Sequence, residues 1–217
     1  MKIGLTTTVP VEVILAAGHT PVDLNNLFIT ADDCGAMVAR AEMDGYPRNA
    51  CAWIKGIYAA ALDHDIETVI AVTQGDCAQT HAMIETLADR GVRIIPFAYP
   101  YDRDEELLSL QMRRLMDHFG VTWDQAEQVR EDLRPLRAQV AEIDRLTWDA
   151  GLVNGSENHY YQVCCSDFNG DPERFAGEVA RFLETARQRS PARELVRIGV
   201  AGVPTIYSNL YEFVESL

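Results

Sequence analysis

The stretch Thr68–Ala98, TVIAVTQGDCAQTHAMIETLADRGVRIIPFA, decides the fold. Its first six residues, Thr68–Thr73, are apolar or β-branched without a break, which is typical of a strand buried on both faces. Ala78–Arg90 then has a helical pattern that Gly91 ends, and Val92–Ala98 reads as a second strand. A strand, a helix and a strand at this spacing form a βαβ unit, which predicts a parallel sheet covered by helices.

The residues before this unit supply the other elements of the same predicted domain. Two short extended runs, Lys2–Thr6 and Thr20–Leu24, can add strands to the sheet. Three segments have helical patterns, and the first has a proline near its first turn and a glycine after its end. These helices are expected at Pro10–Ala17, Asp32–Ala41 and Ala52–Asp63. We therefore predict a Rossmann-like α/β domain with a parallel sheet over residues 1–102.

The middle of the chain has a longer, Arg- and Glu-rich pattern. Asp104–Phe119 and Thr122–Asp149 are periodic and should be helices, with Gly120 between them and Pro135 as a candidate kink in the second. A further helix is expected at Asp171–Arg189. Residues 103–192 are therefore predicted to form a helical arm.

The last segment, 193–217, predicts one strand and one helix. Leu195–Ala201, LVRIGVA, has the composition of a strand, and a turn at Gly202 leads into a helix at Ile206–Leu217. A lone strand and helix cannot form a sheet or a core. We expect the first βα unit of a second α/β domain whose remainder is absent from this chain, or a unit that docks on something else.

Composition limits the partners and the compartment. The 217 residues include 19 Lys and Arg against 33 Asp and Glu, a formal charge of −14. This acid excess argues against nucleic acid and anionic membranes as partners. The N-terminus lacks the pattern of a signal peptide, and no apolar run approaches the roughly 18 residues of a spanning helix. A cytoplasmic protein is expected, and its five cysteines favour free thiols or metal ligands over disulfides.

Cys77 and Cys51 are the main candidates for chemistry. Cys77 ends the run Thr73–Cys77, TQGDC, between the buried strand and the following helix, where sites gather in parallel sheets and a helix N-terminus favours a thiolate. Cys51 lies at a second loop-to-helix junction, with Arg48 close by. Both could present sulfur at one rim of the sheet, as soft ligands for an iron–sulfur cluster or zinc. The alternative for each is a packed apolar cysteine.

Other candidates carry less weight. Glu12, one turn into the first helix, is either a buried acid or a charge that suits the helix dipole. His159, in the tripeptide ENH, could serve a site or hold a structural hydrogen bond. Cys34 is expected in the core, and the adjacent Cys164 and Cys165 cannot face one metal together. The chain contains no HExxH, GxSxG, GxxxxGK[ST] or GxGxxG motif.

Six segments together resemble one family, the 2-hydroxyacyl-CoA dehydratase D-component family, which also contains benzoyl-CoA reductase subunits and double-cubane cluster proteins. The segments are Thr6–Asp23 (TTTVPVEVILAAGHTPVD), Ala50–Trp53 (ACAW), Gly75–Cys77 (GDC), Glu157–His159 (ENH), Asp171–Phe175 (DPERF) and Arg197–Pro204 (RIGVAGVP). The resemblance covers nearly the whole chain in register.

The resemblance implies an iron–sulfur enzyme. The family holds a [4Fe-4S] cluster, or a double-cubane cluster in one branch, by cysteines from two α/β domains, and Cys51 and Cys77 match two of these ligands. A third family cysteine lies beyond the end of this chain, and Ala52 replaces the usual proline. An ATP-hydrolysing iron–sulfur activator would deliver one electron to an oxygen-sensitive enzyme of anaerobic metabolism, for radical dehydration of an (R)-2-hydroxyacyl-CoA. A homologous subunit or a second copy would be the other partner.

Three alternatives stay open at the level of sequence. The chain could belong to a benzoyl-CoA reductase-like or double-cubane low-potential reductase. It could instead be a non-catalytic fragment or assembly module without a complete cluster. A zinc-binding or thiol-redox protein is the third alternative, which metal analysis would separate from the others.

Overall fold

The computed structural model describes residues 1–192, 196–202 and 209–217. The chain divides into two compact units, Met1–Arg130 and Glu131–Leu217. The fold is α/β, as predicted, and the one sheet formed by the described residues lies in the first unit.

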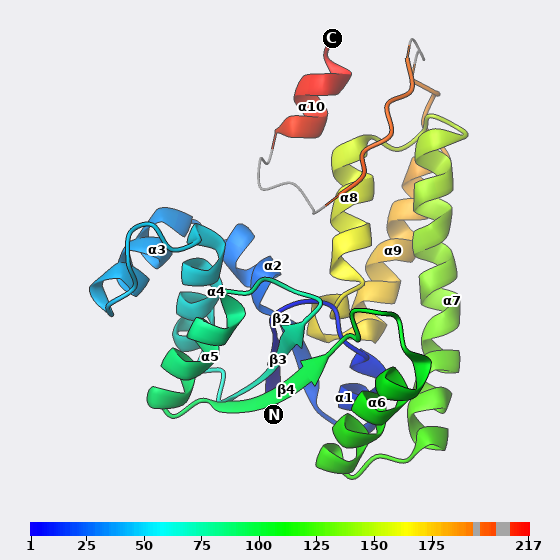
Figure 1. The fold of residues 1–217 in the computed structure, drawn as a ribbon. Coiled ribbons are helices and arrows are strands. Elements are labelled where there is room, and N and C mark those ends of the chain that lie inside the picture. The colour runs from blue at the N-terminus through cyan, green and yellow to red at the C-terminus, as the bar shows by residue number, and fades with distance from the viewer. Residues whose placement is uncertain (193–195, 203–208) are drawn as a thin grey trace. The chain divides into compact units, whose positions relative to one another are not determined.

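Four parallel strands form the sheet in the order β2-β1-β3-β4 (Figure 1). They are β1 (Lys2–Leu5), β2 (Thr20–Asp23), β3 (Thr68–Gln74) and β4 (Arg93–Ala98). The four apolar residues in the middle of β3, residues 69–72, are fully buried, as expected for a strand with helices on both faces. All pairings are parallel, which confirms the predicted sheet.

Helices cover the sheet of the first unit on both faces (Figure 1). On one face α4 packs against α2, α3 and α5. On the other, α1 packs with α6, which also contacts β4. The bounds are α1 (Val11–Ala16), α2 (Leu24–Ile29), α3 (Cys34–Met43), α4 (Ala52–Asp63), α5 (Thr80–Asp89) and α6 (Glu105–Phe119). The main core cluster lies between α4 and its neighbours, so α4 is the buried centre of this face.

The second unit consists of helices. Most of α7 (Trp123–Trp148) belongs to it, and this helix is continuous through Pro135, the candidate position for a kink. It is followed by α8 (Gly155–Cys164), the short 3-10 helix η1 (Phe168–Gly170), α9 (Pro172–Ala186) and α10 (Leu210–Glu215).

The helix α8 was not expected, and it begins with a reciprocal capping box between Asn154 and Glu157.

The predicted strand Leu195–Ala201 is wrong where the structure describes it. Residues 196–201 form no strand, and the side chains of Val196, Ile198 and Val200 are 78, 65 and 63% exposed. The apolar pattern was correct for a strand, but a strand needs a neighbour to accept its hydrogen bonds, and the described residues supply none here. Leu195 and the predicted turn and helix start at 203–208 lie outside the described residues; Leu210–Glu215 within the predicted helix is helical.

Candidate functional site

The carboxyl ends of the four strands lie at one edge of the sheet, because all strands run in the same direction. The loop after β3 carries Cys77, and the loop after β4 begins with Tyr99. The loop after β1 carries residues 6–8, and α2 follows β2 directly. This edge therefore gathers polar groups from four separate parts of the chain.

The turn that presents Cys77 depends on Gly75. The backbone of Gly75 has φ +90°, and a Cβ placed there would lie 2.9 Å from the Cβ of Tyr99. The N–H of Tyr99 donates to the carbonyl of Gln74 at 3.0 Å, so the β3 and β4 loops are held against each other. A side chain at position 75 would be strained by both its φ and this contact. Cys77 itself is exposed.

Cys51 is held beside the Cys77 loop by a side chain that the sequence did not single out. Cys51 is the N-cap residue of α4, and it is half-buried. Its backbone N–H donates a hydrogen bond of 2.8 Å to Oε1 of Gln79, two residues after Cys77. This bond joins segments 28 residues apart, and it brings the two cysteine-bearing loops together at one edge of the sheet.

A buried cation supports the loop that leads into Cys51. Lys55, on the first turns of α4, is only 2% exposed. Its Nζ lies 2.6 Å from Oε1 of Glu42 on α3 and donates to the carbonyl of Arg48 at 3.2 Å. The ion pair thus ties α3, α4 and the Cys51 loop together, and Lys55 supports the approach to Cys51 from inside the protein.

A second set of hydrogen bonds ties the start of α4 to the ends of β1 and β2. Nε1 of Trp53 donates to Oδ1 of Asn25 at 2.5 Å. The side-chain amide of Asn25 donates to the carbonyl of Thr6 at 2.9 Å and to the side chain of Asp23 at 2.7 Å. The Trp53 ring also packs edge-on against Phe28. These contacts fix the direction in which α4 begins, and hence the position of its N-cap cysteine.

Asp76 and His81 are two other polar side chains at or near the Cys77 loop. Asp76 is exposed as a residue, but partial burial of its carboxyl raises its pKa, and the hydrogen bond from the Cys77 N–H opposes that rise. His81 bonds through Nε2 to the carbonyl of Thr73 at 3.0 Å. Because a carbonyl only accepts, Nε2 carries the proton. His81 therefore reaches the end of β3.

Glu12 lies at the same edge, in the first turn of α1. It is half-buried, and its charge contributes to the raised pKa of Tyr99, although burial of the phenol is the larger cause. The Tyr99 hydroxyl donates to the carbonyl of Thr8 at 2.8 Å. The structure thus places Glu12 near Tyr99 at the carboxyl edge, and its catalytic role stays a prediction.

His159 belongs to the second unit, whereas both candidate cysteines belong to the first. It lies on α8, where its Nδ1 is 3.2 Å from the hydroxyl of Tyr211 on α10, and burial lowers its pKa. The two preceding residues also bond to other segments. Glu157 forms an ion pair with two hydrogen bonds to Arg189, and the side-chain amide of Asn158 donates to Asp144 on α7. The tripeptide ENH therefore ties α8 to three other segments, and a catalytic role for His159 stays a prediction.

The other three cysteines, Cys34, Cys164 and Cys165, are buried or half-buried within the fold. The thiol of Cys34 packs against the core and lies 3.0 Å from the carbonyl of Phe28. Cys164 is buried, and this burial raises its pKa to about 12. Burial also raises the pKa of Cys165, which is half-buried. All five cysteines are free thiols, and Cys77 is the exposed one.

The donors for a metal at this edge are few. In residues 1–192, 196–202 and 209–217, no group of three or more His, Cys, Asp or Glu side chains is arranged to hold a metal ion. Cys51 and Cys77 can therefore supply two sulfur ligands, and a full ligand set needs further donors.

Within the same ranges, no helix is long and apolar enough to cross a membrane.

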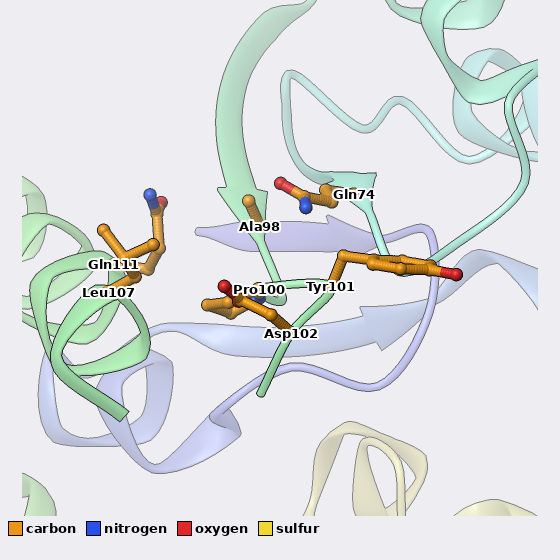
Figure 2. A pocket seen from close by; sticks show the side chains of 7 residues that line it. All are labelled: Gln74, Ala98, Pro100, Tyr101, Asp102, Leu107 and Gln111. Carbon is orange, nitrogen blue, oxygen red and sulfur yellow. The ribbon is translucent and has the colours of Figure 1, made fainter. Parts of the chain in front are cut away.

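A pocket opens next to the Cys77 loop, between the ends of β3 and β4 and the first turns of α6 (Figure 2). Its volume is about 310 Å³. Its lining residues are Gln74, Ala98, Pro100, Tyr101, Asp102, Leu107 and Gln111. The sequence did not reveal this pocket, because its residues come from two strand ends, a loop and a helix.

Comparison with known proteins gives one result for nearly the whole chain. A family model described as 2-hydroxyglutaryl-CoA dehydratase, D-component, matches residues 6–217. No curated protein matches the chain. The match includes the Cys51 loop, the Cys77 loop and the ENH tripeptide.

Proposed function

The chain belongs to the 2-hydroxyglutaryl-CoA dehydratase D-component family, and we propose that it is the iron–sulfur subunit of a 2-hydroxyacyl-CoA dehydratase-type enzyme. The observation that carries this proposal is the hydrogen bond from the Cys51 N–H to Gln79. It brings a second cysteine loop beside the Cys77 loop, at the edge where parallel sheets place their sites.

The two cysteines fit an iron–sulfur centre in donor type. Thiolates are the ligands of [2Fe-2S] and [4Fe-4S] clusters. Cys51 is the N-cap residue of α4, and Cys77 lies in the loop two residues before Gln79, the N-cap of α5. They do not suffice in number, because such clusters take four ligands as a rule. The remaining ligands would come from a partner chain.

When bound, a [4Fe-4S] cluster would transfer to the substrate the single low-potential electron that the proposed reaction needs. The reaction removes a hydroxyl from C2 and a hydrogen from C3 of the acyl group as water, and the starting electron is recovered, so there is no net redox change. Cys51 and Cys77 would hold the cluster, and Gln79 and Lys55 would hold the Cys51 loop.

A dehydration also needs a proton acceptor. Glu12 is the candidate in the first unit, since it is half-buried at the carboxyl edge and its charge acts on Tyr99. A phenol is protonated at neutral pH, and burial raises the pKa of Tyr99 further, so this group can donate a hydrogen bond but does not compete as a base. His159 is the alternative, in the second unit.

The family description names a component, which implies a partner. We propose an ATP-dependent iron–sulfur activator as the source of the electron, and a homologous subunit or second copy as the source of further ligands. The net charge of −14 suits neither nucleic acid nor an anionic membrane.

The proposal is tested by anaerobic reconstitution with iron and sulfide, followed by measurement of bound iron and sulfide per chain. Cys51→Ser and Cys77→Ser should each reduce bound iron strongly. Cys34→Ser is the matched control, because that thiol faces a backbone carbonyl in the core, and it should bind iron like the wild type. Equal iron in all four proteins would contradict the proposed ligands.

A further inference from the structure

The pocket beside the Cys77 loop has a chemical character that bears on the substrate. In Figure 2, Leu107 and Gln111 on α6 form one side, the Tyr101 ring lies on the other, and Pro100 and Asp102 lie between them. Tyr101 is 93% exposed and Leu107 is 47% exposed. These two apolar groups would be removed from water by a ligand in the pocket, which favours an apolar occupant.

The pocket and the Cys77 loop share a wall. Gln74 lines the pocket and is also the first residue of the segment that leads to Cys77. The carbonyl of Gln74 accepts from Tyr99, which is followed by the lining residues Pro100 and Tyr101. A group bound in the pocket would therefore lie against the same loop pair that positions the candidate metal ligand.

The charge of the pocket excludes one type of acyl group. Of the seven residues that line it, Asp102 is the only one with a charge, and Gln74 and Gln111 contribute neutral amides. The segment 102–106, DRDEE, which leads into α6, carries four carboxylates and one guanidinium. A carboxylate in this pocket would lose water without gaining a cationic partner, and it would be repelled by Asp102.

The size of the pocket fits a small group. Pockets for whole drug-sized ligands range over roughly 300–1,000 Å³, and this one is near the lower limit. It can take a short acyl chain but not a coenzyme. The amides of Gln74 and Gln111 can still bond to a hydroxyl or a carbonyl oxygen of that chain.

We propose that this pocket binds the acyl group of the CoA thioester, and that it selects a short neutral acyl group against one with a terminal carboxylate such as glutaryl. This inference rests on the proposed function. It differs from the substrate in the family's name, because the glutaryl chain carries a charge for which the lining residues have no counter-charge.

The test compares two thioesters that differ only at the chain end. Binding of pentanoyl-CoA and glutaryl-CoA to the full chain is measured by calorimetry, with free CoA as the baseline. The wild type should bind pentanoyl-CoA about tenfold more tightly than glutaryl-CoA, because the terminal carboxylate of the glutaryl group would have no cationic partner in the pocket. Gln111→Arg, which adds a cation to the lining, should reduce or reverse this ratio.

Two further variants make the result decisive. Asp102→Asn removes the repelling charge without adding bulk, and it should also reduce the ratio. His118→Arg adds a cation to α6 at a residue that does not line the pocket, and it should leave the ratio unchanged. The inference is overturned if the wild type binds glutaryl-CoA as tightly as pentanoyl-CoA, if both bind no better than CoA, or if Gln111→Arg and Asp102→Asn leave the ratio unaltered.

The bound iron of the same samples is measured in parallel. Iron that depends on Cys51 and Cys77 together with no acyl preference would reject the pocket and retain the proposed function. An acyl preference without such iron would do the reverse.

Discussion

The ion pair between Lys55 and Glu42 is predicted to be a major support of the first unit. The side chain of Lys55 is 3% exposed and that of Glu42 is 30% exposed, with 2.6 Å between Nζ and Oε1. Lys55→Met leaves a carboxylate that water can still reach. Glu42→Met leaves an ammonium group inside the protein, with only the Arg48 carbonyl as a partner. The second change should therefore be the more harmful.

The magnitudes follow from this difference in burial. Breaking a fully buried pair by removing one partner costs about 3–5 kcal/mol, and this pair is buried on one side only. We expect Glu42→Met to lower the free energy of unfolding by about 3 kcal/mol and Lys55→Met by about 2 kcal/mol. The double variant leaves no unpaired charge, so it should cost about 2 kcal/mol, well below the sum of the single changes.

The assay is urea unfolding followed by the fluorescence of Trp53. This residue lies on α4, two positions before Lys55, and Trp123→Phe and Trp148→Phe make it the sole tryptophan. The free energies come from linear extrapolation, and thermal melts should shift by roughly 2–4 °C for each kcal/mol. Alkylation of Cys51 should also become faster in Lys55→Met, because the carbonyl of Arg48 loses its hydrogen-bond donor.

The reasoning is refuted if Lys55→Met is the more harmful change, or if both single variants stay within about 0.5 kcal/mol of the parent, the range of ordinary surface substitutions. Strict additivity in the double variant would show that the two side chains do not interact in solution.

Three further predictions follow from individual contacts. In thermal melts, Gly75→Ala should destabilise the first unit by about 1 kcal/mol more than Gly91→Ala. Both glycines have a positive φ, but only Gly75 lies against Tyr99, so equal losses of stability would contradict this contact. Iodoacetamide at pH 8 should modify the exposed Cys77 long before Cys164, whose pKa burial raises to about 12, and peptide mass spectrometry showing equal rates would argue against this burial. Burial lowers the pKa of His159, so protonation favours the unfolded chain, and the contribution of this histidine to stability falls as the pH drops below about 6.5. An NMR titration midpoint of His159 at or above about 6.5 would contradict the lowered pKa.

The sheet could be predicted from sequence because its central strand has a local signature. Thr68–Thr73 is apolar or β-branched throughout, and the structure buries its central residues completely. The helix α8 was harder, since GSENHYYQVC has no strong apolar periodicity. Its only local signal was the pair Asn154 and Glu157, which form the capping box. Residues 196–201 show the opposite case, in which a good strand pattern lacks a neighbouring strand among the described residues.

The surroundings of the candidate cysteines depend on long-range contacts. The position of Cys51 and Cys77 before two helices could be read from the loops, but Gln79 is an exposed glutamine without any local mark. Lys55 did carry a signal, a lysine inside the otherwise apolar run of α4, AWIKGIYAAAL. A buried charge in such a run requires a charged partner, and the structure identifies Glu42. The pocket could not be predicted, because three separate elements form it.

The proposed function requires Cys51 and Cys77 to act together at one edge of the sheet. A reagent that becomes fluorescent only when it bridges two neighbouring thiols tests this directly, with peptide mapping to identify the bridged pair, in the chain before and after anaerobic loading with iron and sulfide. We predict a Cys51–Cys77 bridge in the unloaded chain and protection of both thiols after loading. Single alkylation of each cysteine without a bridge, or a bridge that forms equally well after loading, would contradict the account.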